Sequence, residues 1–336
     1  MDTGLVLAVL LAIAFAATNG LHDASNAIAT LVATRAATPS QAIVLAAVFN
    51  LLGPFLIGAA VADTIAGIVT VPADEATAVI GAGLAAAVGW NLITWYWGLP
   101  SSSGNALVGG LVGAALVQGG VDAVNWGGFN GFRPDGVIGV LVALAISPVL
   151  GGLAAFLVIR GLRRAARRAT RRFHGPVNGG QWVMSAALAF SHGANDAQKS
   201  VGVIVALLLA AGEINSLSAP TWTTLACAAA LTIGTSLGGW RIIRTVGRRI
   251  YRIQPIEGLS SQTASAGVIL GASLLGAPTS TTQVVASSLV GIGAGRGRLH
   301  HVHWLIVRRM GFAWLVTLPV TAVLAAGAFG IWSLLS

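Results

Sequence analysis

Two aspartates, Asp23 and Asp196, lie within long apolar stretches of a chain of 336 residues. If such a stretch spans a membrane, a carboxylate near its centre costs about 2.5–3.5 kcal/mol on insertion scales and needs a function or a firm partner. One interpretation makes each aspartate the cap of a half-helix. The other makes the pair bind a cation or a proton, and the recurrence of the pair in similar surroundings favours this second role.

The only lysine, Lys199, follows Asp196 by three residues. When the two aspartate segments are aligned, Lys199 falls opposite Asn26, whose amide oxygen could bind a sodium ion. An ammonium group cannot do so, and instead brings a fixed positive charge close to Asp196. We therefore expect this half of the chain to hold no sodium, and protons to be carried by Asp23 or Asp196. A lysine that merely neutralises Asp196, or extends toward the membrane surface, is the structural alternative.

Hydroxyl-rich segments follow each aspartate at a distance, directly after Leu99-Pro100 and Ala277-Pro278. A proline that interrupts a helix frees backbone N–H groups at a positive helix end, which suits an anion. Hydroxyl groups add neutral donors to such a site. Turn chemistry after a proline is the simpler explanation, but it does not explain hydroxyls in the middle of an apolar region. The candidate donors are Ser101, Ser102, Ser103, Thr279, Ser280, Thr281 and Thr282.

The composition indicates a membrane protein. Hydrophobic residues make up 55% of the chain and charged residues 9%, against about 25% charged in soluble domains. The single cysteine, Cys227, excludes an internal disulfide and a multi-cysteine metal site. A Gly-Lys-Ser/Thr phosphate loop is absent, and no Ser-His or metal-ligand set has a usable spacing. We expect no enzyme, no cofactor and no resident metal. His22 and His192 could relay protons, although a structural donor is the commoner role.

Apolar stretches long enough to span a bilayer, about 20 residues each, indicate a multi-pass protein. Two further apolar regions, 78–118 and 262–295, are interrupted by the prolines named above and are predicted to form re-entrant helical hairpins. The six uninterrupted stretches are 4–33, 41–62, 137–159, 182–211, 220–239 and 310–333.

Arginine positions predict the orientation. Seven arginines fall in 160–172, five in 241–252 and four in 296–309, and Arg35 follows the first span. Placing all of them in the cytoplasm satisfies the positive-inside rule and leaves only Arg133 outside. Both termini are then extracytoplasmic, in a plasma (inner) membrane. The basic run 160–172 could suggest nucleic acid, but beside a span it indicates orientation and contact with anionic lipid.

The chain resembles itself. Gly20–Ala27 is similar to Gly193–Ser200, and Gly98–Asn105 is similar to Gly276–Gln283. Asp23 precedes Pro100 by 77 residues and Asp196 precedes Pro278 by 82. Two motifs in the same order at nearly the same spacing predict a duplication, and the arginine pattern makes the copies inverted, as in secondary transporters. We expect a first repeat at 1–135, a connecting span and basic loop at 136–181, a second repeat at 182–309 and a terminal span at 310–336. Each repeat is expected to contain a broken helix, at 19–26 and at 191–199.

These motifs, with Gly238-Gly239-Trp240-Arg241, resemble the inorganic phosphate transporter (PiT) family, and Asn195-Asp196 in its run Ser191–Lys199 is most similar to the bacterial low-affinity branch. The resemblance implies a phosphate symporter in which Asp23, Asn26, Asn195, Asp196 and the seven hydroxyl residues surround phosphate and the coupling ion. The chain departs from the family at Asn105 and Gln283, which replace histidines, and at Gly104, which replaces a hydroxyl residue. Relatives with altered segments of this kind can carry sulfate.

The sequence thus predicts an all-α polytopic membrane protein of two inverted repeats with broken helices and two re-entrant hairpins. We expect alternating-access symport of inorganic phosphate, either free or as a metal–phosphate complex, coupled to protons. Sodium coupling, transport of sulfate or another oxyanion, and an anion channel are the alternatives. The expected partners are phosphate, a coupling cation (H⁺ or Na⁺) and the lipid bilayer, with no nucleic acid; a homo-oligomer is left open.

Overall fold

The computed structural model describes residues 2–130, 133–165, 174–237, 250–251 and 253–335. Gly238–Arg241 and most arginines of 160–172 and 241–252 lie outside the described residues. The described chain is helical apart from a two-residue hairpin, β1 (Phe129–Asn130) with β2 (Arg133–Pro134), which confirms the all-α prediction. The helices are α1 (Thr3–Ala33), α2 (Pro39–Leu56), α3 (Ala60–Ala66), α4 (Ala73–Trp97), α5 (Ser103–Gly119), α6 (Gly136–Ala165), α7 (His174–Ala210), α8 (Thr221–Leu237), α10 (Pro255–Leu274), α11 (Thr281–Gly295) and α12 (Trp304–Leu335), with 3₁₀ turns η1 (Gly120–Ala123) and η5 (Leu299–His301).

Membrane-spanning helices are present in the described part of the chain, where six are long and apolar enough to cross a bilayer by length and composition. Four coincide with the expected spans 4–33, 41–62, 137–159 and 310–333. The other two are α4 and the α5–η1 segment, which form the first proline-interrupted region. The six are Thr3–Ala33, Pro39–Leu56, Ala73–Trp97, Ser103–Ala123, Gly136–Ala165 and Trp304–Ser333. The remaining expected spans, 182–211 and 220–239, correspond to α7 and α8.

The helices that carry the two aspartates are continuous, so the predicted breaks at 19–26 and 191–199 are wrong. Asp23 and Asp196 lie in helix interiors and cap nothing. The glycines beside them serve packing instead. A Cβ atom on Gly20 would lie 2.0 Å from the Leu231 carbonyl oxygen of α8, and one on Gly193 would lie 2.2 Å from the Asn50 oxygen of α2. These glycines let backbones touch where helices cross.

The proline segments do interrupt their helices. α4 ends before Gly98, whose φ of +65° is left-handed, and Ser102 caps α5 by accepting the Asn105 N–H at 3.2 Å. The second interruption repeats this design: Gly276 has φ +69°, and Ser280 caps α11 by accepting the Gln283 N–H at 3.4 Å. Each region is therefore a helix, a short tip and a second helix. We name residues 98–102 the first tip and residues 275–280 the second tip.

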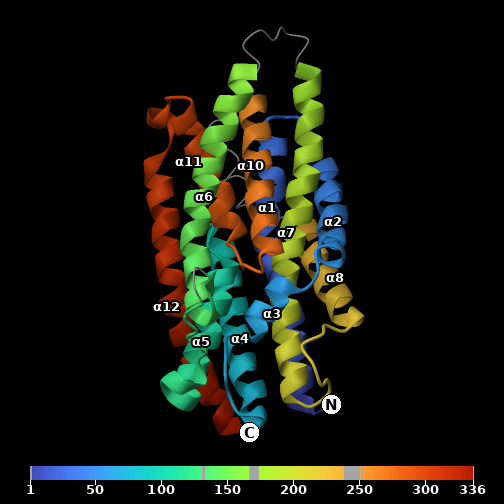
Figure 1. Ribbon diagram of the computed structural model, residues 1–336, viewed down its shortest axis with the longest axis vertical. Helices are drawn as coiled ribbons and strands as arrows, with labels where there is room; N and C mark the ends of the chain where they lie inside the picture. The colour runs from blue at the N-terminus through green and yellow to red at the C-terminus, as the bar shows by residue number, and fades with distance from the viewer. Residues whose placement is uncertain (1, 131–132, 166–173, 238–249, 252, 336) are drawn as a thin grey trace.

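The two tips approach the middle of the molecule from opposite ends (Figure 1). Both chain termini lie at one end, and α4 and α5 occupy that half. α10 and α11 occupy the other half, toward which α6 ends and α7 begins. Two buried apolar clusters match these halves: one includes Leu5–Ala16 of α1, and the other includes Ala27–Leu31. The polar centre of α1, with Asp23, lies between them.

Close glycine contacts also join the helices of the first hairpin to their neighbours. A Cβ atom on Gly110 would lie 2.4 Å from the Gly83 oxygen of α4, and Gly109 and Gly113 approach the backbone of α12 just as closely. The sequence predicted packing roles for these three α5 glycines, and they are confirmed. The same prediction for Gly271 is wrong, because no described atom lies within 4 Å of a Cβ placed there.

Candidate functional site

Thr281, the first residue of α11, joins the two aspartates. Its hydroxyl lies 2.9 Å from Asp196 Oδ2 and 3.3 Å from Asp23 Oδ2, and the Thr282 hydroxyl donates to Asp23 Oδ1 at 2.6 Å. The Asn26 amide donates to both threonine hydroxyls, at 3.2 and 3.0 Å. A hydroxyl has a single proton, so Thr281 can donate to only one carboxylate at a time. The two carboxylates therefore compete for one donor, and all five side chains are buried.

Lys199 lies on the other side of Asp196. Its ammonium forms an ion pair with Asp196 Oδ1 and donates to the Thr279 carbonyl oxygen at 2.6 Å. The side chain is 1% exposed although it is charged. A lysine is almost never fully buried unless it is paired. The alternative of a lysine that extends toward the membrane surface is therefore wrong, whereas its pairing with Asp196 is present.

Gly104, at the start of α5, provides the space for this lysine. A Cβ atom on Gly104 would lie 3.5 Å from Lys199 Nζ. In the aligned second motif, the corresponding position is Thr282, which contacts Asp23 and Asn26. One half of the site thus combines an amide with a hydroxyl, and the other combines an ammonium with a glycine. The two departures visible in the sequence, Lys199 and Gly104, meet in space.

Two histidines extend the polar network. His22 Nδ1 lies 3.1 Å from Asp23 Oδ1, while its Nε2 lies 3.2 Å from the hydroxyls of Ser101 and Thr94. His22 therefore connects Asp23 to the first tip. His192 Nε2 lies 3.0 Å from Asp196 Oδ2, and its Nδ1 lies 3.0 Å from Asn50 Oδ1. Each histidine thus bridges an aspartate and a neutral polar group, a geometry that suits either proposed role, relay or donor.

Asn195 holds the backbone of the second tip. Its amide donates to the Ser273 hydroxyl at 3.0 Å and to the Ala277 carbonyl oxygen at 3.3 Å, and its oxygen accepts the Thr279 N–H at 3.2 Å. These bonds use both ends of the side chain. The structure therefore places Asn195 on the tip, as a positioning residue, while Asp23 and Asp196 face Thr281.

The hydroxyl residues of the tips have different surroundings. Ser102 and Ser280 are helix caps, Ser101 contacts His22, and Thr281 and Thr282 contact the aspartates. The Ser103 and Thr279 hydroxyls are buried and have no hydrogen-bond partner among the described residues. Buried polar groups are nearly always partnered, so these two are the hydroxyls available to a ligand.

Sequence reasoning missed several residues of this network. Thr94 contacts His22, Asn50 contacts His192, and Ser273 contacts Asn195. None belongs to a recurring motif. Their only signal is a polar side chain inside an apolar helix, and many such residues make only local backbone bonds.

The aspartate site could also hold a cation. Asp23, His192 and Asp196 each offer a ligand atom, and these atoms lie within 4.8 Å of one another. Lys199 and Thr281 compete for the same carboxylate oxygens. With both histidines neutral, two carboxylates and one ammonium leave one net negative charge on the buried site.

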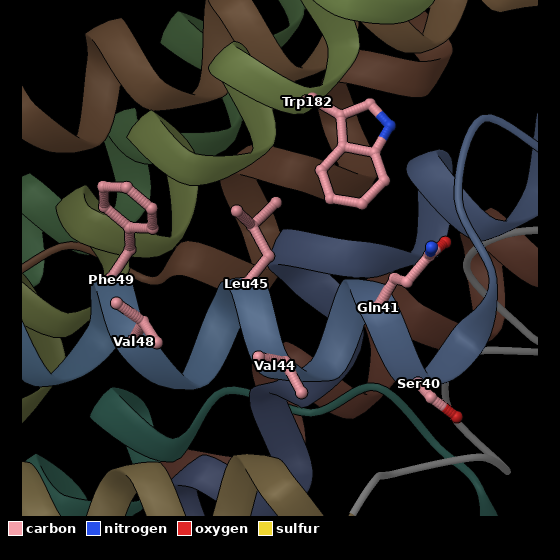
Figure 2. Close-up of a pocket in the computed structure, with 7 residues that line it drawn as sticks. All are labelled: Ser40, Gln41, Val44, Leu45, Val48, Phe49 and Trp182. Atoms are coloured by element: carbon pink, nitrogen blue, oxygen red, sulfur yellow. The ribbon is translucent and has the colours of Figure 1, made fainter.

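Two surface cavities differ in chemistry. A cavity of ≈ 650 Å³ reaches the second tip at Gly276 and Pro278 and is also lined by Asp63 and Asp135. A groove of ≈ 530 Å³ lies between α2 and Trp182 of α7 (Figure 2). Its walls are aliphatic and aromatic, with polar groups only at Ser40 and Gln41. This groove lacks the donors that an anion needs, so only the first cavity has polar access to a tip.

Known proteins share this sequence and fold. A relative from Bacillus subtilis described as a probable low-affinity inorganic phosphate transporter is 39% identical over the whole of both chains. One from Mycobacterium bovis with the same description is 40% identical over 97% of this chain and 77% of its own. A solved structure described as the sodium-dependent phosphate transporter has a TM-score of 0.87 and 26% identity, and covers both chains completely.

The family assignment rests on a match that covers most of the chain. The model of the phosphate transporter family matches residues 19–325, which include both aspartates, both tips and Lys199. The family and its named members are transporters rather than enzymes, as the sequence predicted. This chain belongs to the phosphate transporter family.

Proposed function

We propose that this chain is a secondary active transporter that carries inorganic phosphate with protons across the plasma membrane by alternating access. The observation that carries the proposal is the buried pair Asp23 and Asp196, joined by Thr281 and neutralised on one side only by Lys199. The names of the relatives support phosphate as the substrate.

The donors around the tips suit a tetrahedral oxyanion. The N-termini of α5 and α11 direct free N–H groups toward the centre, and such helix ends attract anions. The buried hydroxyls of Ser103 and Thr279 lack partners in the described structure and add two donors. Lys199 adds positive charge beside them. Asp23, Asn26, Asp196 and the hydroxyls of Thr281 and Thr282 complete the proposed site, with Ser101, Ser102, Ser280 and Asn195 supporting the tips.

Protons are the proposed coupling ions, and Asp23 is their proposed carrier. Lys199 already neutralises Asp196, whereas no cationic side chain pairs with Asp23 in the described chain unless His22 is protonated. A phosphate dianion next to an uncompensated carboxylate is repelled strongly at low dielectric. A proton on Asp23 removes this repulsion, so proton and phosphate binding favour one another.

Sodium coupling is the second candidate, supported by the description of the solved neighbour as sodium-dependent. The half-site of Asp23, Asn26, Thr281 and Thr282 keeps oxygen atoms that could bind sodium. The other half-site, with Lys199, does not suit it. We therefore propose protons for the coupling and regard a metal–phosphate complex as one form of the substrate.

The proposed topology is a pair of inverted repeats, 1–135 and 182–309, with re-entrant hairpins at 78–118 and 262–295. The approach of the tips from opposite ends of the molecule supports it (Figure 1). The ion pair of Lys199 with Asp196 and the contact of Gly104 with Lys199 bring both repeats to one centre. The termini are proposed to be extracytoplasmic.

Uptake of labelled phosphate into proteoliposomes tests the proposed function. We expect accumulation above the external concentration, because a symporter stores the free energy of its coupling gradient. Equilibration without accumulation would indicate an anion channel. Unlabelled phosphate should abolish the signal, and an equal excess of sulfate should leave most of it; the reverse result would make sulfate the substrate.

A further inference from the structure

Polar side chains line α1 and α10 between the aspartate site and the end of the molecule toward which α6 ends and α7 begins. Three of them, Thr30, Gln262 and Ser265, are buried and have side-chain atoms without hydrogen-bond partners among the described residues. For Gln262 this includes both its oxygen and its nitrogen. An unpartnered buried group costs about 1–3 kcal/mol, so three neighbouring ones indicate a missing ligand.

A contact of three helices fixes the register of α1 against α10. The Thr34 hydroxyl donates to Gln181 Oε1 of α7 at 2.7 Å. A Cβ atom on Gly258, in the first turn of α10, would lie 2.6 Å from the same oxygen and 3.0 Å from Thr34 Cγ2. Gly258 therefore faces Thr34 and Gln181 directly. Gln181 is buried and Thr34 half-buried, so this contact closes the end of the interface.

One helical turn further in, Thr30 of α1 faces Gln262 of α10. The two helices pack against each other and run in opposite directions, because Gly258 meets Thr34 while Thr281, beyond the end of α10, meets Asn26. Four residues advance an α-helix by about 6 Å and return to nearly the same face. Counting four residues inward from Thr34 gives Thr30, and four inward from Gly258 gives Gln262.

The next turn reaches the site. Ser265 lies seven residues from Gly258, about 10 Å along α10 and on the same face. Asn26 lies eight residues from Thr34, about 12 Å along α1, and donates to Thr281 and Thr282. Polar groups thus continue from the aspartate site to the Thr34–Gln181 contact without an apolar layer.

The other half of the chain provides an internal comparison. With Pro278 aligned to Pro100, Gln262 and Ser265 correspond to Leu84 and Ala87 of α4. With Asp23 aligned to Asp196, Thr30 corresponds to Val203 of α7. Leu84, Ala87 and Val203 are buried members of one apolar cluster. Equivalent positions therefore build a hydrophobic core in one half and a polar line in the other, and burial alone does not require the polar line.

We infer that Thr30, Gln262 and Ser265 form a second, transient binding site for the oxyanion on its way between the aspartate site and the α6–α7 end. The Thr34–Gln181 hydrogen bond closes its outer side. The inference rests on the proposed function, since it concerns the route of the same anion. Amide and hydroxyl donors are neutral, so they bind an anion more weakly than charged groups do and release it readily.

Substitution of Gln262 by the residue of the other half tests this site. Gln262→Leu should reduce the initial rate of phosphate uptake into proteoliposomes at least 10-fold. Equilibrium binding of labelled phosphate to the purified protein should stay within about twofold of wild type, because the aspartate site is intact. Its melting temperature should not fall, since an unpartnered buried amide has been removed. Wild-type uptake by a folded Gln262→Leu protein would overturn the inference, whereas no uptake by wild type itself would refute the proposed function instead.

A labelling experiment tests the same site independently of transport. Cys227 is fully buried, so introduced cysteines can be read with little background. We expect Ser265→Cys to react with a small anionic thiosulfonate reagent at least 10-fold faster than Ala87→Cys, its counterpart in the apolar half. Phosphate in excess should slow the first reaction. Equal reactivity of the two cysteines, or no reaction at Ser265→Cys, would contradict an anion site at this position.

Discussion

At the scale of single residues, the aspartate site owes its asymmetry to a paired replacement. Lys199 and Gly104 occupy the positions that Asn26 and Thr282 occupy in the other half, and a Cβ on Gly104 would lie within 3.5 Å of the ammonium. A lysine side chain needs more room than an asparagine, so the loss of a side chain at position 104 accommodates it. Lys199 then provides a permanent cation where the other half keeps neutral oxygen and nitrogen atoms.

This asymmetry predicts the outcome of restoring symmetry. In the double variant Lys199→Asn, Gly104→Thr, Asp196 loses its fixed counterion and gains oxygen neighbours like those of Asp23. We expect sodium to stimulate uptake by the double variant at least fivefold while leaving wild type unchanged. Uptake assays with sodium or choline in the medium measure this effect.

The matched control is Gly104→Thr alone, which keeps the lysine and crowds it. It should transport poorly and remain indifferent to sodium. Sodium stimulation of the single variant, or none of the double variant, would mean that Lys199 does not determine the coupling ion.

Much of the site at this scale was predictable from motifs, and part of it was not. Asp23, Asp196 and Lys199 stand out because isolated charges in apolar segments need partners. The link from His22 to Ser101 joins residues 79 positions apart, and that from Asn195 to Thr279 joins residues 84 apart. Such contacts depend on how the tips fold back, and no local pattern encodes them.

At the scale of elements, a buried ion pair holds the base of the second hairpin together. Arg296, which follows α11, pairs with Glu257 in the first turn of α10. Glu257 also accepts the Gln254 N–H at 2.7 Å and the Tyr251 hydroxyl at 3.1 Å. Burial and the negative charge of Glu257 raise the pKa of Tyr251, so its phenol remains a donor. The two limbs of the hairpin are thus fastened at the end opposite the tip.

Breaking this pair should destabilise the protein. Removing one partner of a buried ion pair costs about 3–5 kcal/mol, because the remaining charge is uncompensated. We expect Glu257→Gln to lower the melting temperature in detergent by several degrees, whereas Arg309→Gln, at an exposed position of α12, should leave it within a degree. Equal melting temperatures for the two variants would show that the pair contributes little.

The elements also show where sequence reasoning fails. Apolar stretches and prolines located the helices and both tips, since length and proline geometry act locally. Gly20 and Gly193 beside the aspartates suggested broken helices, but these residues meet the backbones of α8 and α2. A glycine in an apolar segment permits either a break or a close crossing, and only the neighbouring helix decides between them.

At the scale of the whole molecule, the proposed topology makes a prediction about the two faces. Ser216, between α7 and α8, and Arg163, near the end of α6, are exposed at opposite ends of the described structure (Figure 1). In intact cells, Ser216→Cys should react with a membrane-impermeant thiol reagent, and Arg163→Cys should react only after permeabilisation. The reversed pattern would invert the orientation, and labelling of both in intact cells would contradict the topology.

The central claim is that phosphate moves with protons, and purified protein in proteoliposomes tests it most directly. A pH gradient, acid outside, and an inward sodium gradient are imposed separately at the same membrane potential, and the uptake of labelled phosphate is measured. We predict accumulation with the pH gradient alone and none with the sodium gradient alone. Accumulation that requires sodium and ignores the pH gradient would contradict the role assigned to Asp23 and Lys199.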